Sequence, residues 1–225
     1  MTTSAAQRKH MILGQIYTNE VNDMRILQAL ADIPREPFAP ESLRAAAYAD
    51  SELDLGNGRG LMAPLTFTRL LQLAEITPSC RVLNIGCATG YSAAILSRLA
   101  AQVTATDTDT AMLTQARNAI DRSGARNVQL QQVSSLAEGY AQNAPYDAII
   151  IQGAIDYLPD AVASQLAEGG RLVTVLRNAA HPAMKSVYGR ALLVRRLDNR
   201  LQHRDQFETA AMLLPGFERN AGFSF

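Results

Sequence analysis

Short apolar runs alternate with stretches of helical spacing through the middle of the chain. We expect a strand where four to six apolar residues are bounded by glycine or polar residues, and a helix where apolar residues recur every three or four positions. Because strands that alternate with helices pair in parallel, this order predicts an α/β fold whose mostly parallel sheet is covered by helices on both faces. The predicted strands are 81–85, 102–106, 127–132, 147–151 and 171–176, and the predicted helices are 91–100, 109–123 (ended by Gly124) and 158–167 (ended by Gly169-Gly170).

The two ends of the chain have different patterns. Residues 187–197 and 204–209 predict two longer strands, which we expect to form an antiparallel pair at the edge of the sheet. The N-terminal part is predicted to be helical with turns, and we expect one domain over residues 1–225, in which residues 1–79 form a cap on a sheet core of residues 80–225. Its predicted elements are a helix over 4–15, a helix over 23–30 capped by Asn22, a proline-rich turn over 33–40, a short helix over 41–47, a glycine-dense loop over 55–60 and a helix that starts at Pro64.

Composition narrows the classes of partner and compartment. Lys plus Arg and Asp plus Glu both number 21, so the formal net charge is zero, and we expect neither a nucleic acid nor a membrane surface as a partner. Cys80 and Cys87 flank a predicted strand, which places them roughly 20 Å apart at about 3.3 Å per residue, too far for a disulfide. Free thiols and no visible export signal predict a cytoplasmic protein.

The turn after the first predicted strand is the clearest candidate for a ligand site. Small residues stand at Gly86, Ala88 and Gly90, where backbone can approach a ligand closely. The dinucleotide fingerprint requires a small residue five positions after the first glycine, but here that residue is Tyr91, which argues against a nicotinamide or flavin cofactor. Asp107 ends the next strand, 21 residues after Gly86, where a carboxylate can accept both hydroxyls of a ribose. The pattern predicts an adenosine-type ligand; the alternative is a tight turn followed by a surface aspartate that caps the next helix.

Several segments carry a resemblance to a known family. Residues 33–41 (IPREPFAPE), 47–50 (AYAD), 81–91 (RVLNIGCATGY), 144–150 (APYDAII) and 166–173 (LAEGGRLV) are similar, in order, to motifs of the protein-L-isoaspartate O-methyltransferases. The resemblance implies a Rossmann-like S-adenosylmethionine-dependent methyltransferase fold with a seven-stranded sheet. It also implies S-adenosyl-L-methionine as the cofactor, and a methyl transfer to a carboxylate of damaged protein, so that the partner is a protein or peptide.

The predicted cofactor site combines the turn, the acidic residue and the ends of neighbouring strands. For Tyr91, packing over the cofactor and filling of the core remain alternatives. His10, His181 and His203 lack the spacing of metal ligands, so no metal site is predicted. The predicted cofactor-binding residues are Asn84, Gly86, Cys87, Ala88, Gly90, Tyr91, Asp107, Thr108, Ser134, Ser135 and Gln152.

The chain departs from the family pattern at four places. Met62 stands where the family has a serine placed at the reacting centre, and a thioether cannot donate a hydrogen bond, so no catalytic residue is assigned. Asn84 replaces the usual acid, Ala88 the central glycine, and Ser134-Ser135 an Asp-Gly pair. Two hypotheses follow: an active methyltransferase of isoaspartyl type or with another substrate, or a catalytically silent protein of this fold that acts by binding.

Overall fold

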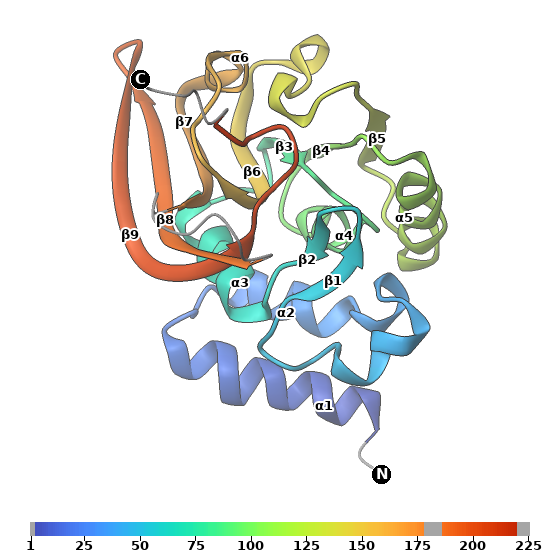
Figure 1. Cartoon of the computed structure of the whole chain (residues 1–225). Coiled ribbons are helices and arrows are strands. Elements are labelled where there is room, and N and C mark those ends of the chain that lie inside the picture. Colours follow the sequence, from blue (N-terminus) through green and yellow to red (C-terminus); the bar gives the residue numbers. More distant parts are fainter. Residues whose placement is uncertain (1–2, 178–185, 220–225) are drawn as a thin grey trace, which may run out of the picture.

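Seven strands form the main sheet, in the order β5-β4-β3-β6-β7-β8-β9. The computed structural model describes residues 3–177 and 186–219. The five strands from β5 to β7 are parallel, and β8 and β9 follow as an antiparallel pair at one edge, as Figure 1 shows. The parallel sheet and the antiparallel edge pair confirm the predicted fold class. The strands are β3 (Arg81–Ile85), β4 (Gln102–Asp107), β5 (Val128–Gln132), β6 (Tyr146–Ile155), β7 (Leu166–Arg177), β8 (Ser186–Leu197) and β9 (Arg200–Met212).

Alternate residues of the central strands supply two hydrophobic cores. Val82 of β3 and Ile150 of β6 are buried in one cluster, which also contains the apolar faces of the N-terminal helices. Their neighbours Leu83 and Ile149 are buried in a second cluster with Val162. Burial of both faces explains why these strands are apolar at nearly every position.

The helices cover the sheet and extend the first core. They are α1 (Ser4–His10), α2 (Met24–Asp32), α3 (Pro64–Ala74), α4 (Tyr91–Leu96), α5 (Thr110–Ser123) and α6 (Asp160–Ala163). A π-helix (Met11–Ile16) and 3-10 turns (Tyr17–Asn19, Glu36–Phe38, Glu41–Ala46, Leu136–Glu138 and Ala141–Asn143) complete the helical segments. In Figure 1 the blue helices α1 and α2 lie at the bottom of the view, below the hairpin of β1 (Leu53–Gly56) and β2 (Arg59–Leu61). None of the helices described is long and apolar enough to cross a membrane.

Local predictions were wrong at β7 and at the start of α2. Gly169-Gly170 does not end a helix but lies inside β7, because the chain from Leu166 onward pairs with β6, and this sheet pairing overrides the local signal. The helix predicted over 158–167 is accordingly shorter than expected: it is α6 (Asp160–Ala163), and β7 begins at Leu166. The cap of α2 is Asp23, whose side chain accepts a hydrogen bond from the Arg25 amide, and not Asn22.

The glycine-dense loop predicted over 55–60 is a β-hairpin. Gly56, Asn57 and Gly58 at its tip all have positive φ angles, of 85°, 53° and 68°. Glycine and asparagine adopt this left-handed region most readily, which allows the chain to reverse so tightly. The hairpin forms a two-stranded sheet of its own, separate from the seven-stranded one.

Candidate active site

The turn after β3 is held against β4 by backbone hydrogen bonds. The amides of Gly86 and Cys87 both donate to the carbonyl of Thr106, at 2.9 and 3.0 Å. Gly86, Ala88 and Gly90 all have positive φ angles (77°, 48° and 92°). For Ala88 this conformation costs about 1–2 kcal/mol, because its Cβ approaches the next carbonyl. The spacing of small residues read from the sequence therefore corresponds to three left-handed positions in one turn.

Gly90 serves packing between helices. A Cβ at this position would lie 2.9 Å from Cβ of Ala116 in α5 and 3.1 Å from Cδ1 of Ile120. Gly90 also precedes α4 as its N-terminal cap residue. Its lack of a side chain allows the start of α4 to approach α5.

Asp107, predicted to bind a ribose, is fully buried and has four hydrogen-bond donors around its carboxylate. Its Oδ1 accepts from the amides of Thr108 and Asp109, at 2.8 and 3.1 Å. Its Oδ2 accepts from the amide of Ala88 at 2.7 Å and forms a buried ion pair with Nη2 of Arg59. An ionised carboxylate has about four lone-pair sites, so all of them are in use. In this conformation no acceptor is left for ribose hydroxyls.

The helix after Asp107 is capped by another residue. Oδ1 of Asp109 accepts from the amides of Ala111 and Met112, at 2.9 and 3.0 Å. The alternative of a surface Asp107 that caps this helix is therefore wrong, because the cap is Asp109 and Asp107 is buried.

Two side chains from outside the sheet lie against the Gly86 turn. A Cβ on Gly86 would be 3.1 Å from Nη2 of Arg59 and 3.1 Å from Cδ1 of Leu214. Leu214 is fixed at the carboxyl end of β6, because its amide donates to the carbonyl of Ala154 at 2.9 Å. In Figure 1 the dark red coil after β9 runs from the end of that strand towards β3 and β6. The carboxyl ends of parallel strands are where ligands bind in open α/β sheets, so both side chains occupy the predicted cofactor crevice.

The space that remains at the turn is small. A cavity of about 10 Å³ is lined by residues that include Met62, Phe67, Gly86, Cys87 and Gln152. Sites for small molecules are usually about 300–1,000 Å³ in volume. The crevice as it stands therefore does not fit S-adenosylmethionine.

The polar groups around the crevice are nevertheless incompletely paired. Within the part of the chain that the structure describes, the buried atoms here without a hydrogen-bond partner are Nε and Nη1 of Arg59, Oδ1 of Asn84, Oγ1 of Thr106 and Nε2 of Gln152. Each buried polar atom left unpaired costs about 1–3 kcal/mol. The donors and acceptors thus suit a polar ligand, although the closed conformation leaves no room for one.

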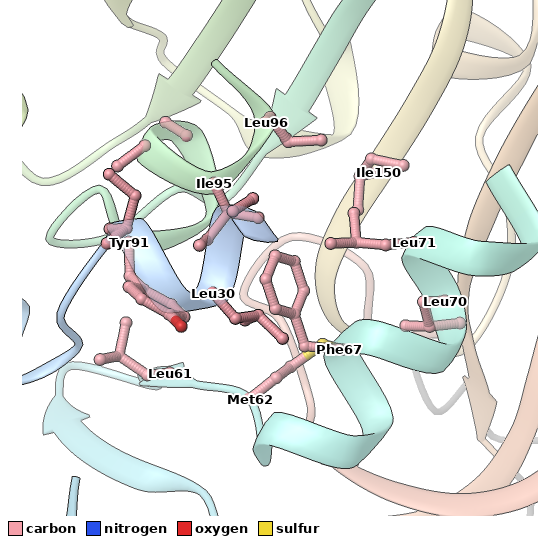
Figure 2. Close-up of a cluster of buried hydrophobic side chains, with 14 of the residues drawn as sticks. Leu30, Leu61, Met62, Phe67, Leu70, Leu71, Tyr91, Ile95, Leu96 and Ile150 are labelled. Atoms are coloured by element: carbon pink, nitrogen blue, oxygen red, sulfur yellow. The ribbon is translucent and has the colours of Figure 1, made fainter. Parts of the chain in front are cut away.

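The floor of the site is apolar, as Figure 2 shows for Leu61, Met62, Phe67 and Tyr91. Met62 is buried and its side chain points towards Phe67, so the position of the family serine is part of the core. Tyr91 is also buried and packs edge-to-face on Phe38, with ring centroids 5.5 Å apart. Burial raises the pKa of the Tyr91 phenol, and the neighbouring Arg35 opposes this shift. Tyr91 fills the core in this conformation.

The other predicted residues lie near the same edge of the sheet. Asn84 donates from Nδ2 to Oγ of Ser92 at 2.7 Å, so it links β3 to α4. After β5, Ser134 donates to Glu138 at 3.0 Å, and Oγ of Ser135 accepts from the amide of Ala137 at 3.3 Å. Burial strongly raises the pKa of the Cys87 thiol. These residues remain predicted cofactor contacts, together with Thr108 and Gln152.

Groups of metal-ligating residues do not occur among the residues described. His10 and His203 are exposed, and His181 lies outside the described residues. Sequence reasoning missed Arg35, Arg59 and Leu214, which are all buried at the site. The available signal for Arg35 was its place between prolines, and the signal for Arg59 was its place within a glycine-rich segment. Nothing in the local sequence marks Leu214.

Comparisons with known proteins agree on one family. The sequence model described as "Protein-L-isoaspartate(D-aspartate) O-methyltransferase (PCMT)" matches residues 6–194. Protein-L-isoaspartate O-methyltransferase 1 of Rhodopseudomonas palustris (strain HaA2) is 38% identical over 172 residues, which cover 76% of this chain and 70% of the relative. Protein-L-isoaspartate O-methyltransferase of Koribacter versatilis (strain Ellin345) is 35% identical over 202 residues, which cover 90% of this chain and 87% of the relative.

Two solved structures have the same fold. A protein-L-isoaspartate O-methyltransferase superposes with a TM-score of 0.80 at 25% identity, over 93% of this chain and 66% of the other. A Plasmodium falciparum beta-aspartate methyltransferase in complex with S-adenosyl-L-homocysteine gives a TM-score of 0.75 at 13% identity, over 98% of this chain and all of the other. At 13% identity the second likeness shows the fold alone. Because the family model matches most of its length, the chain belongs to the protein-L-isoaspartate(D-aspartate) O-methyltransferase family.

Proposed function

We propose that this chain is an S-adenosylmethionine-dependent methyltransferase that methylates the carboxylate of an isoaspartyl residue in damaged protein. The observation that carries this proposal is the family match over residues 6–194. The left-handed turn at Gly86 and the buried Asp107, which stand at the carboxyl ends of β3 and β4, support it. A protein or peptide is therefore the methyl acceptor.

The proposed reaction does not require a general base from the chain. A carboxylate with a pKa near 4 is already ionised at neutral pH, so its oxygen can act as a nucleophile without a general base. The cofactor, when bound, supplies an electrophilic methyl group on its sulfonium. The apolar side chains of Met62 and Phe67 would keep water away from the reacting atoms, and the surrounding residues would position them. The hydroxyl that the family places at Met62 is not required for ionisation of the acceptor.

The test compares two peptides that differ in one linkage. Labelled S-adenosylmethionine is incubated with the full chain and either an isoaspartyl peptide or its aspartyl twin. We expect label in the isoaspartyl peptide, and background in the twin and with Gly86→Val, whose side chain would be strained at a φ of 77° and would lie against Arg59 and Leu214. Background labelling of both peptides by the unaltered chain would reject the isoaspartyl assignment.

A second candidate is a catalytically silent protein that acts by binding. The ion pair between Arg59 and Asp107, together with Met62 at the serine position, favours it. Turnover of any acceptor would exclude this function.

We propose that the protein is cytoplasmic and has no nucleic-acid partner. The free thiols of Cys80 and Cys87 support the compartment. The balanced charge supports the absence of a nucleic-acid partner.

A further inference from the structure

We propose that Arg59 is an intramolecular competitor of the cofactor: its guanidinium occupies the place of the ribose and must leave Asp107 before the cofactor can bind. This inference rests on the proposed function. It adds to that function an autoinhibitory contact made by the chain's own β1–β2 hairpin.

The competition is for the same acceptor atoms. Three of the four donors on Asp107 are backbone amides that belong to the fold itself, at Ala88, Thr108 and Asp109. The fourth is Nη2 of Arg59, which comes from another element. A ribose hydroxyl can therefore reach Asp107 only where Arg59 now donates.

The guanidinium also blocks the approach to the backbone. Nη2 and Nη1 of Arg59 would lie 3.1 and 3.2 Å from a Cβ on Gly86. This is the position at which the turn would contact a ligand. Leu214 closes the other side, with Cδ1 at 3.1 Å from the same point. The cofactor must displace the arginine and also needs the leucine side chain to rotate away.

The closed state is built so that Arg59 can withdraw. β1 and β2 form a sheet of their own, so a movement of the hairpin breaks no hydrogen bond of the seven-stranded sheet. The tip residues Gly56, Asn57 and Gly58 are exposed. The far end of β2 is fixed, because Nη2 of the buried Arg35 donates to the carbonyls of Leu61 and Met62, at 3.3 and 2.6 Å. At the tip, Nδ2 of the exposed Asn57 donates to Oδ2 of Asp109 at 3.1 Å, so withdrawal of Arg59 has to break this surface hydrogen bond. The hairpin thus has one buried, anchored end and one exposed tip, and Arg59 lies at the start of β2, beside the tip.

The unpaired atoms identify what would favour opening. Among residues 3–177 and 186–219, Nε and Nη1 of Arg59 have no hydrogen-bond partner in the closed state, and neither have Oδ1 of Asn84 and Nε2 of Gln152. Opening would hydrate the guanidinium and offer the two amide atoms to a polar ligand. The closed state is therefore not the best-satisfied arrangement of these groups once a ligand is present.

The test is a calorimetric titration with S-adenosylhomocysteine as the probe. It compares the unaltered chain with Arg59→Gln, which keeps a polar side chain but removes the charge and shortens the reach. The matched control is Arg117→Gln, which alters an exposed arginine of α5. We expect Arg59→Gln to lower Kd at least tenfold and the control to leave it unchanged. Leu214→Ala, on the other side of the crevice, should also lower Kd.

A kinetic measurement on the unaltered chain covers the case in which Arg59→Gln fails to fold. If the crevice must open first, the observed rate constant of binding will level off or fall as the probe concentration rises. A rate constant that rises linearly throughout would overturn the proposal.

The titration separates this inference from the function on which it rests. Measurable binding with equal Kd for the unaltered chain and Arg59→Gln overturns the competitor role and leaves the proposed function standing. Weaker binding by Arg59→Gln does the same, because Arg59 would then be a cofactor contact. If folded chains show no binding at millimolar probe, both proposals fail.

Discussion

The guanidinium carbon of Arg35 lies 4.9 Å from the centre of the Tyr91 ring. This contact joins the proline-rich motif of the N-terminal part to the first residue of α4. Nearby, Oγ1 of Thr89 donates to the carbonyl of Phe38 at 2.6 Å. Two of the segments that carry the family resemblance, residues 33–41 and 81–91, are thus packed on each other, which gives a physical reason for an arginine between prolines.

Replacement of Arg35 should therefore destabilise the fold. Arg35→Ala leaves the carbonyls of Leu61 and Met62 without their donor and opens a cavity beside Tyr91. We expect the free energy of unfolding, measured by urea denaturation, to fall by about 2–4 kcal/mol. The matched control Arg44→Ala removes an exposed arginine and should change it by less than about 0.5 kcal/mol. Equal effects of the two variants would show that the buried contacts of Arg35 are not stabilising.

Met62→Ser should lower stability and raise isoaspartyl methylation. Met62 is only 3% exposed, so its loss leaves a cavity and buries a hydroxyl, and we expect a decrease of about 2–4 kcal/mol. Met24→Ser, at a position that is 70% exposed, is the control and should stay within about 0.5 kcal/mol. Methyl incorporation is measured in parallel. A Met62→Ser protein with unchanged stability would contradict the predicted cavity, and one without increased labelling would contradict the predicted gain in methylation.

The two cysteines should differ in reactivity. Burial strongly raises the pKa of the Cys87 thiol, which is 1% exposed, whereas Cys80 is partly exposed. Because the thiolate is the reactive form, iodoacetamide at pH 8 should modify Cys80 much faster than Cys87. Mass spectrometry of the digested protein measures both rates, and unfolding in guanidinium should make them similar. Similar rates in the folded protein would mean that the crevice is open.

Stability should fall in strong alkali through Tyr48. Burial, and then the hydrogen bond to Glu36, raise the pKa of Tyr48 to about 12, compared with about 10 when unfolded. The folded state therefore holds this proton more tightly, so the stability is fully present below pH 10 and is lost as the pH rises towards 12.

The control for this titration is Tyr48→Phe. Burial also raises the pKa of Tyr146 to about 12, so the unaltered chain loses stability through both phenols. Urea denaturation between pH 8 and pH 12 should show a smaller alkaline loss in Tyr48→Phe. Parallel curves for the two proteins would contradict the contribution of Tyr48.

The parallel core was predictable because its signals are local. Residues 81–85 form a strand in the sequence pattern and in the structure, since burial on both faces favours apolar residues at Val82, Leu83 and Ile85. Gly124 ends α5 in the left-handed conformation, as its place after a helical pattern indicated. Gly169-Gly170 misled the prediction because pairing between β6 and β7 is a tertiary effect that no local signal reports.

The site was predictable in its position but not in its state. The turn at Gly86 and the strand end at Asp107 follow from spacing, and the structure brings them together through the amide of Ala88. The partner of Asp107 could not be found in this way, because Arg59 is 48 residues away and belongs to a separate hairpin. Such an ion pair depends on how two elements pack, and the sequence pattern of either element is silent about it.

The outer strand β9 has 13 residues and, among the residues that the structure describes, pairs with β8 alone. An unpaired strand border can recruit a strand from another molecule and begin a fibre. Arg200, Arg204 and Asp205 are exposed along its first half, and charged side chains there make such recruitment unfavourable. These charged residues therefore protect the edge strand from pairing with another molecule, and their substitution by valine would make this edge of the sheet a site of aggregation.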